Sequence, residues 1–287
     1  REDFADYLGE AMAFDAACGE ILEMVKEMGE LENTFICISG DHGIPGYPRG
    51  KCNVTDFGAR VLLAMRWPKG LKAEQTIDAP VSLVDLTPTF LAVADLKSPD
   101  DPNGQDLIAA LAGEETLRNW ALIGRERHTH VAQVDWMPYP TRALRTPDHL
   151  YVINFKPERY PMGNPMKITD DHTPSFEDLA NTTYEGYSDI DAGPTKAWLV
   201  QNRKKDELAE YIDFAWGKRP EYELYDLKKD PHQMKNVADQ KEYAEVWKQL
   251  HEQLMTELEK NEDPRLDDAF DRPPYLVDGK GQKRAKK

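Results

Sequence analysis

Apolar residues recur at intervals of three and four through the first segment of the chain. This spacing over residues 4–28, with Gly29 directly after it as a stop signal, predicts an amphipathic helix. Two short apolar runs follow at residues 34–38 and 61–65, and neither alternates with polar residues. Continuous runs of this kind are typical of strands buried on both faces, as in a parallel sheet that helices cover.

The residues around these two runs complete a layered pattern. The segment after the first run is rich in glycine and proline up to Gly50, which indicates a loop. Residues 82–94 return to helical spacing, and Pro88 within them implies either a kink or a position in the first turn. The order helix, strand, loop, strand, helix predicts that this region belongs to an α/β layer.

The pattern changes beyond about residue 115. Short runs typical of β-strands are separated by proline-rich turns, and they lie at residues 121–124, 150–155 and 221–227. A helix with a long apolar stripe is predicted from about residue 241 to residue 260. Together these elements indicate a smaller α+β domain with an antiparallel sheet.

The length of the chain agrees with more than one domain, because 287 residues correspond to about two domains of ordinary size. We divide the chain into residues 1–115, which form part of the α/β domain, and residues 116–260, which form the smaller domain. Residues 261–287 contain three prolines and a basic end, and we expect an extended tail there.

Charge excludes two classes of partner. The 36 basic and 52 acidic residues give a formal net charge of −16, which disfavours general binding to nucleic acids and to anionic membrane surfaces. The longest apolar run, residues 61–65, is far too short to cross a bilayer. Residues 1–3 lead into the first helix without an initiator methionine or a secretory signal. We therefore expect that a leader has been removed or that the start belongs to a longer polypeptide.

Asp41 and His42 are the first candidates for chemistry. They follow the first strand candidate, and ligands of open α/β sheets bind outside the carboxyl ends of strands. A carboxylate and an imidazole at that place could bind one cation. The alternative is that Asp41 caps the following loop and His42 is an ordinary neighbour.

Lys51 and a His-x-His pair are the next candidates. Lys51 follows the glycine- and proline-rich loop and could offer a point charge to an anion, although spacing alone favours a plain surface lysine. His128 and His130 could share one face of a strand as metal ligands, or could line a pocket for an anionic sugar together with Arg142. They could also belong to a solvated polar stretch. The chain contains neither a phosphate-binding glycine loop nor a G-x-S-x-G nucleophile elbow.

Several motifs occur together and in order. They are NT…SGDHG at residues 33–43, GK…DFGARV…RWP at 50–68, VSLVDLTPT at 81–89 and ELYDL…DP…NVA at 223–238. This combination resembles the C-terminal half of type I sulfatases, in the alkaline phosphatase superfamily. The stretches DHGIP, PRGKCN and YPTRALRT are also similar to bacterial relatives of heparan N-sulfatase (sulfamidase).

The resemblance implies a fold and a site. The fold is α/β: part of a mixed sheet sandwiched by helices, followed by a smaller C-terminal α+β domain with an antiparallel sheet. The family binds one divalent cation, usually Ca²⁺, and its ligands would include Asp41 and His42. Because imidazole suits Mn²⁺ or Zn²⁺ better than Ca²⁺, the identity of the metal stays open.

The resemblance also assigns roles around the sulfate group. Lys51 matches the catalytic basic residue that contacts the sulfate and can assist the leaving group. The remaining candidates, which we expect in the substrate pocket, are Arg49, His128, His130 and Arg142.

The nucleophile of the family is absent from the printed residues. It is a formylglycine made from Cys or Ser in a C/S-x-P/A-x-R motif, and none of Cys18, Cys37 and Cys52 stands in such a motif. We therefore expect the formylglycine on the missing N-terminal half, which would be a partner of this chain. Without it, we expect this chain to be inactive.

The resemblance predicts a sulfatase that hydrolyses sulfate esters or N-sulfate groups of a sulfated saccharide. One alternative is a phosphate- or phosphonate-ester hydrolase of the same superfamily, because those enzymes share the Asp-His pair. Another is a non-catalytic fragment that binds glycans. The resemblance further implies a periplasmic or secreted location.

Overall fold

The computed structural model describes residues 1–98, 103–114 and 116–276, and within it the chain forms two compact units. Unit 1 holds Arg1–Asp41, Val61–Leu122 and Arg145–Pro147, and unit 2 holds His42–Arg60, Ile123–Leu144 and the chain from Asp148 onward. The division expected from the sequence, at residues 115 and 260, stays a prediction. Residue 115 and the basic end at 277–287 lie outside the described residues.

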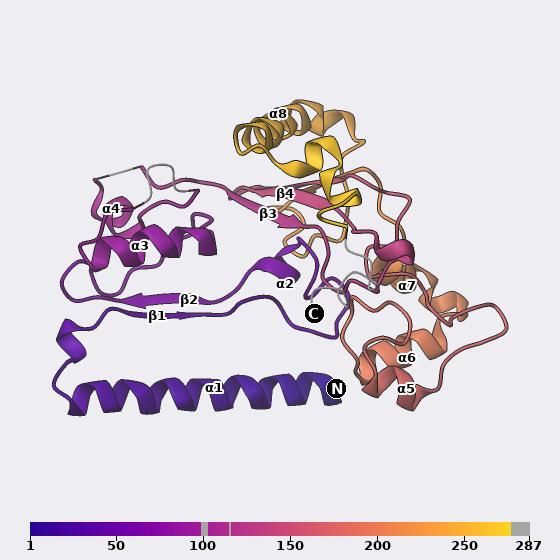
Figure 1. Cartoon of the computed structure of the whole chain (residues 1–287), viewed down its shortest axis with the longest axis horizontal. Coiled ribbons are helices and arrows are strands. Elements are labelled where there is room, and N and C mark those ends of the chain that lie inside the picture. Colours follow the sequence, from indigo (N-terminus) through magenta and orange to yellow (C-terminus); the bar gives the residue numbers. More distant parts are fainter. Residues whose placement is uncertain (99–102, 115, 277–287) are drawn as a thin grey trace, which may run out of the picture. The chain divides into compact units, whose positions relative to one another are not determined.

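Unit 1 combines helices with a pair of strands (Figure 1). Its regular elements are α1 (Glu2–Glu27), β1 (Ile36–Ser39), β2 (Leu63–Arg66), α3 (Leu86–Val93) and α4 (Leu107–Ala112). The predicted first helix is confirmed. Acidic residues in its first turn and a lysine in its last turn complement the helix dipole, and Gly29 follows with a positive φ of 75°.

The strands β1 and β2 pair with each other in antiparallel register, from Ile36 opposite Arg66 to Ser39 opposite Leu63. The expectation of a parallel arrangement was therefore wrong for this pair, although the mixed α/β class is confirmed. An apolar run without alternation identifies a strand but does not fix its direction, because both faces look alike in either orientation. The residues of β1 are only half-buried in the chain as it stands.

The helix predicted over residues 82–94 begins as a 3₁₀ turn, Leu83–Asp85, and continues as α3. Ser82 and Asp85 form a reciprocal capping box. Pro88 is the third residue of α3 and lies in its first turn, where its missing N–H costs no intrahelical hydrogen bond. Asp85 is buried and receives two hydrogen bonds from Arg118, at 2.8 and 3.0 Å.

Unit 2 is built around the second sheet, whose strand order is β3-β4-β5-β6. The strands are β3 (Ala121–Arg125), β4 (Thr141–Arg145), β5 (His149–Asn154) and β6 (Tyr222–Asp226). The predicted antiparallel pairing is confirmed for β5 and β6. The helix α8 (Ala244–Lys260) also agrees with its prediction and buries Leu250, Leu254 and Leu258.

Four further helices of unit 2 were not predicted. They are α2 (Asp56–Ala59), α5 (Phe176–Asn181), α6 (Pro194–Asn202) and α7 (Ala209–Trp216). The last three surround an apolar core that includes Met162, Leu179, Ile190, Val200 and Trp216. Trp216 stacks on Tyr187 with their ring centroids 4.6 Å apart. This core supports the loop that carries part of the candidate site.

Residues 264–271 were expected to be an extended tail, and this was wrong for them. They form two 3₁₀ helices, Pro264–Asp267 and Ala269–Asp271. The side chain of Arg265 is fully buried and bonded to Glu126, Asp268 and Asp271. Ion pairing to distant residues therefore gives this segment a structure that its proline content did not suggest.

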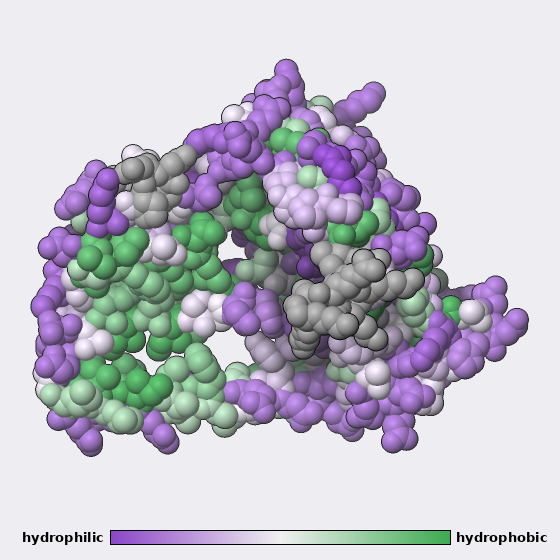
Figure 2. Space-filling view, viewed as in Figure 1, coloured by the Kyte–Doolittle hydropathy of each residue, from purple (hydrophilic) through white to green (hydrophobic). Residues whose placement is uncertain are grey.

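One side of unit 1 is strongly apolar and open. Helix α1 has no buried residue, and Phe14, Ile21 and Met24 on it are each more than half exposed. Figure 2 shows apolar side chains gathered over α3, the strands and α1, with open space between α1 and the strands. Among the described helices, none combines the length and apolar character needed to cross a bilayer.

Candidate functional site

A tight loop of unit 2, residues 42–60, positions Lys51. The N–H of Lys51 donates to the carbonyl of Ile44 at 3.0 Å, which folds the loop back on itself. A Cβ at Gly50 would lie 2.2 Å from the same carbonyl oxygen, so only glycine fits there. The loop also places Arg49 and Cys52 in the left-handed region, with φ of 62° and 73°.

Lys51 is fixed by a carboxylate far away in the sequence. Its Nζ donates to Oδ2 of Asp191 at 3.1 Å, and both side chains are about one-quarter exposed, at 23% and 30%. This pairing keeps the ammonium group extended and still reachable from solvent. The ion pair gives Lys51 a defined position, and its catalytic role stays a prediction.

Asp189 organises a second set of groups close in sequence to Asp191. One of its carboxylate oxygens accepts from Nη2 of Arg125 at 2.5 Å, and the other accepts from the N–H of Thr129 at 2.8 Å. His128 lies 3.5 Å from the second oxygen and is the exposed member of the set. Burial alone would raise the pKa of Asp189, but Arg125 and His128 outweigh it and hold this pKa below its usual range.

The loop that carries both aspartates is anchored by the apolar core and by a buried lysine. Ile190, between them, is buried in the apolar core. The fully buried Lys196 donates to the carbonyls of Ile190 and Thr183 at 3.1 and 3.0 Å. Burial lowers the pKa of Lys196 to about 8. These contacts fix the backbone of the loop that contains Asp189 and Asp191.

Cys52 lies beside these charges but is not activated by them. Burial raises the pKa of its thiol to about 11, and the opposing effects of Arg125 and Lys51 do not compensate. Its carbonyl accepts a hydrogen bond from Nη1 of Arg125 at 2.6 Å. Cys52 therefore connects the loop to Arg125 through its backbone, and its sulfur is protonated at neutral pH.

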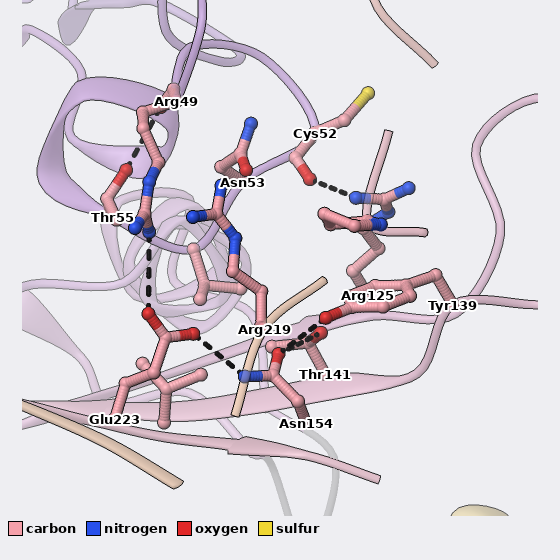
Figure 3. Close-up of a pocket in the computed structure, with 13 residues that line it drawn as sticks. Arg49, Cys52, Asn53, Thr55, Arg125, Tyr139, Thr141, Asn154, Arg219 and Glu223 are labelled. Atoms are coloured by element: carbon pink, nitrogen blue, oxygen red, sulfur yellow. Dashed lines mark hydrogen bonds and ion pairs between the residues drawn. The ribbon is translucent and has the colours of Figure 1, made fainter. Parts of the chain in front are cut away.

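A pocket opens behind this loop, within unit 2 (Figure 3). Arg49 and Arg219 lie side by side in its wall, and Arg49 contacts Oε2 of Glu223 at 3.5 Å. Glu223 is buried and also accepts from Asn154 at 2.8 Å and from the hydroxyl of Tyr225. Burial alone would raise the pKa of Glu223, but the two arginines lower it below its usual range.

Two of the predicted substrate contacts have other partners. Arg142 is buried and forms a bidentate pair with Asp263, at 2.6 and 2.9 Å, and a further pair with Glu126 at 2.9 Å. These contacts occupy its guanidinium group within the fold. His130 stacks on Trp136 with ring centroids 5.1 Å apart. A substrate role for either residue stays a prediction, and the geometry favours His128 over both.

Comparison with known proteins finds two family models that match parts of the chain. The sequence model of the sulfatase family matches residues 1–96, and a second model, described as the C-terminal part of N-sulphoglucosamine sulphohydrolase, matches residues 197–261. The two matches occur in the order that the motifs indicated. Residues 1–96 are thus similar to sulfatases, and residues 197–261 are similar to the C-terminal part of N-sulphoglucosamine sulphohydrolase.

Curated relatives agree with these matches. The chain is 29% identical over 269 residues to human N-sulphoglucosamine sulphohydrolase, covering 88% of this chain and 47% of that protein. It is also 29% identical over 241 residues to an ulvan-active sulfatase of Formosa agariphila, covering 84% of this chain and 35% of that protein. The chain thus spans less than half the length of these relatives.

Solved structures show the same fold. One is a complex of a protein with its substrate, D-glucosamine-2-N,6-O-disulfate; it has a TM-score of 0.56 at 22% identity and covers 88% of this chain and 40% of that one. A phosphonate monoester hydrolase from Silicibacter pomeroyi has a TM-score of 0.53 at 18% identity, covering 89% and 40%. These likenesses concern the fold and do not distinguish the two chemistries.

The metal prediction rests on neighbouring donors at the end of β1. Asp41 is the last residue of the first stretch of unit 1, and His42 opens unit 2. The Nδ1 atom of His42 lies 2.9 Å from the carbonyl oxygen of Gly43. Across the described ranges, no three His, Cys, Asp or Glu side chains form a group that could hold a metal ion. Asp41 and His42 therefore do not make a complete cation site with these residues, and their role stays a prediction.

Sequence reasoning missed most of the groups that position the site. Asp189, Asp191 and Arg219 lay in no recognised motif. Arg125 and Glu223 stood inside stretches that had been interpreted as a polar segment and a strand. What identifies these residues as part of the site is contact between positions that are 64 to 174 residues apart in the sequence. Examples are Arg125 with Asp189 and Arg49 with Glu223. A single sequence does not display contacts of that range.

Proposed function

We propose that this chain is part of a sulfatase that hydrolyses sulfate esters or N-sulfate groups of a sulfated saccharide. The observation that carries the proposal is the placement of Lys51, which is held by Asp191 and remains open to solvent. The proposal is supported by the two family-model matches and by the relatives, which include a human N-sulphoglucosamine sulphohydrolase and an N-acetylglucosamine-6-O-sulfatase of Bacteroides thetaiotaomicron.

Lys51 would act on the sulfate group directly. Its ammonium group would donate hydrogen bonds to sulfate oxygens and offset the negative charge that grows on the leaving oxygen or nitrogen. Asp191 would hold the ammonium in position before substrate arrives, so less ordering is needed on binding. His128 would contact the saccharide from the same side of unit 2, since it is exposed and oriented by Asp189.

The nucleophile would come from outside these residues. The chain has no C/S-x-P/A-x-R motif, and Cys52 has both the wrong sequence context and a thiol pKa raised to about 11. We place the formylglycine on the N-terminal part of the complete enzyme. Asp41 and His42 would give one carboxylate and one imidazole to a divalent cation, with the remaining ligands on that part as well; the cation would polarise the sulfate when bound.

The N-terminal part is also the partner that the open side of unit 1 suggests. The exposed apolar residues of α1 and the half-buried strand β1 would be covered by the rest of the family's sheet. We further propose a periplasmic or secreted location, in line with relatives such as an extracellular sulfatase homologue of Drosophila melanogaster.

The test is sulfate release by the natural gene product that contains this chain. Substrates are N-sulfoglucosamine and glucosamine 6-sulfate, and sulfate is measured by ion chromatography. We expect Lys51→Ala to lower kcat/KM at least about a hundredfold, in the range found when one charge-stabilising donor is removed. Lys248→Ala, which removes an exposed lysine of α8, should leave the rate unchanged.

The other outcomes identify the alternatives. Release of phosphate from phosphate or phosphonate esters, without sulfate release, would replace the proposal by the related hydrolase. Binding of sulfated sugars without any turnover would replace it by a glycan-binding protein. A reading frame that begins at Arg1 with no separate chain carrying the formylglycine motif would rule out an active enzyme.

A further inference from the structure

The pocket of unit 2 has an imbalance of charge in its wall (Figure 3). Three arginines, Arg49, Arg125 and Arg219, line it, whereas Glu223 is the one carboxylate among its 13 described lining residues. Asp189, which does not line the pocket, neutralises Arg125 at 2.5 Å. Among the described lining residues, Glu223 is then the one carboxylate that can balance the charges of both Arg49 and Arg219.

Neither of these two arginines reaches solvent freely. The side chain of Arg49 is 11% exposed and Arg219 is 8% exposed. A buried charge without a counter-charge is costly, so the pair requires a second anion or ordered water. The hydroxyls of Tyr139 and Tyr225 do not supply that charge, because burial raises the pKa of both well above neutrality.

Unused hydrogen-bond donors point to the same conclusion. Among the described residues, the buried Nε atoms of Arg49 and Arg125 have no acceptor. The side chain of Arg125 is more than nine-tenths buried and lines the pocket. The acceptor that the structure gives Arg219 is the carbonyl of Phe214, at 2.8 Å. Guanidinium groups pair best with the oxygens of carboxylates, sulfates and phosphates.

We propose that this pocket binds one small oxyanion between Arg49, Arg125 and Arg219. The free space is too narrow for a sugar ring, so only a small group could enter it. The oxyanion is either a free ion or a charged group that projects from a bound saccharide. The proposal goes beyond hydrolysis at Lys51 and is measured without turnover, so it can fail or succeed independently of the proposed function.

The experiment is calorimetric titration of the purified 287-residue chain with sodium sulfate against a sodium chloride background of equal ionic strength. Arg219→Gln should weaken sulfate binding about tenfold or more, the equivalent of one charge-assisted hydrogen bond. The matched control is Arg272→Gln, which removes a charge from an arginine that is 57% exposed. The control should bind sulfate as the unmodified chain does.

Folding is checked separately for each variant by circular dichroism. Arg219→Gln removes one of two like charges that share a single carboxylate, and we expect it to fold. If Arg219→Gln does not fold, Arg219→Lys takes its place. This variant keeps the positive charge but lacks the planar guanidinium group, and it should bind sulfate more weakly than the unmodified chain. Equal sulfate affinity in the unmodified chain and the folded variant overturns the proposal, as does a lack of sulfate binding in the unmodified chain.

Two further titrations distinguish the sources of the oxyanion. If a glucosamine disulfate competes with inorganic sulfate and Arg219→Gln weakens its binding, the pocket receives a group carried by the saccharide. If the saccharide binds without displacing sulfate, the pocket receives a free ion. Both titrations are carried out in the Lys51→Ala variant, because Lys51 does not line this pocket and sulfate bound at Lys51 would otherwise contribute to the signal.

Discussion

Asp189 is the residue on which the geometry of the candidate site depends most. It pairs with Arg125 at 2.5 Å, receives the N–H of Thr129 and orients His128, while its own side chain is 4% exposed. Removing one partner of a buried ion pair leaves the other charge unpaired. We therefore expect Asp189→Asn to lower the free energy of unfolding by about 3 kcal/mol at pH 7, measured by urea denaturation.

The same residue predicts a pH dependence. Because the folded-state pKa of Asp189 lies below its usual value of about 3.9, its contribution is complete above that pH and is lost as the pH falls through the lowered pKa. The difference in stability between the unmodified chain and Asp189→Asn should therefore shrink in acid. Asp267→Asn, at an aspartate 68% exposed, serves as the control. Equal urea midpoints for both variants at pH 7 would contradict the role given to Asp189.

Cys52 gives a prediction about reactivity. With a thiol pKa of about 11, it should carry far less thiolate at pH 8 than an unperturbed cysteine. We expect iodoacetamide to alkylate Cys52 about a hundredfold more slowly than free cysteine at pH 8, with a rate that rises as the pH approaches 11. Peptide mapping by mass spectrometry measures this rate at Cys52. Rapid alkylation at pH 8 would mean that the surrounding cations activate the thiol.

At this scale, the sequence predicted residues that stand in local motifs and missed those defined by distant contacts. Lys51 was assigned a role from the motif in which it stands, although its spacing alone favoured a plain surface lysine, and that role stays a prediction. Its partner, Asp191, lies 140 positions away and had no local signal. Arg142 illustrates the opposite case, because its motif suggested a substrate contact while Glu126 and Asp263 engage it inside the fold.

At the scale of elements, long periodic segments were the most predictable. Helices α1 and α8 have 26 and 17 residues, and both repeat their apolar pattern over several turns. Helices α5, α6 and α7 have only six to nine residues, too few for the pattern to repeat clearly. The direction of β2 relative to β1 depends on how the two strands pair in space, and the apolar runs contain no information about that pairing.

The segment after α8 gives an element-scale prediction. Arg265 is fully buried and binds Glu126 at 2.6 and 3.0 Å, which fastens the two 3₁₀ helices to the end of β3. Arg265→Ala should leave Glu126 without this partner and release residues 264–271, at a cost of about 3–5 kcal/mol. Limited chymotrypsin digestion followed by mass spectrometry should then show faster cleavage after Phe270.

A matched variant checks that the effect comes from the buried ion pairs. Lys260→Ala removes an exposed positive charge at the end of α8 and should not change the digestion pattern. If Arg265→Ala and Lys260→Ala are cleaved after Phe270 at the same rate, the 3₁₀ segment is held by something other than Arg265. Hydrogen exchange over residues 264–271 gives an independent measure of the same release.

At the scale of the whole molecule, charge and surface have different consequences. The net charge of −16 opposes long-range attraction of sulfated polymers, so the proposed binding of a sulfated saccharide would depend on a local cluster such as Lys51, His128 and the pocket arginines. The open apolar side of unit 1 favours association with another polypeptide. The chain spans 47% and 35% of two of its relatives, which supports the remainder of a sulfatase as that polypeptide.

Ile21 offers a test of this association. It lies on the apolar face of α1 and is 60% exposed, so Ile21→Glu should change the stability of the chain by itself by less than about 0.5 kcal/mol. In a complex with the N-terminal part, the same change would place a charge in an apolar interface. We expect the affinity for that part to fall more than about tenfold, since burying an isoleucine contributes about 1.5–3 kcal/mol.

The control places the same charge on the other face of the helix. Ala16 lies roughly opposite the centre of the apolar stripe, and Ala16→Glu should leave association intact. Affinity is measured by titrating the purified N-terminal part of the gene product against each variant. Equal weakening by both variants would mean that charge as such opposes association. If Ile21→Glu binds as tightly as the unmodified chain, α1 does not cover the partner, and the apolar face must be buried by a different contact.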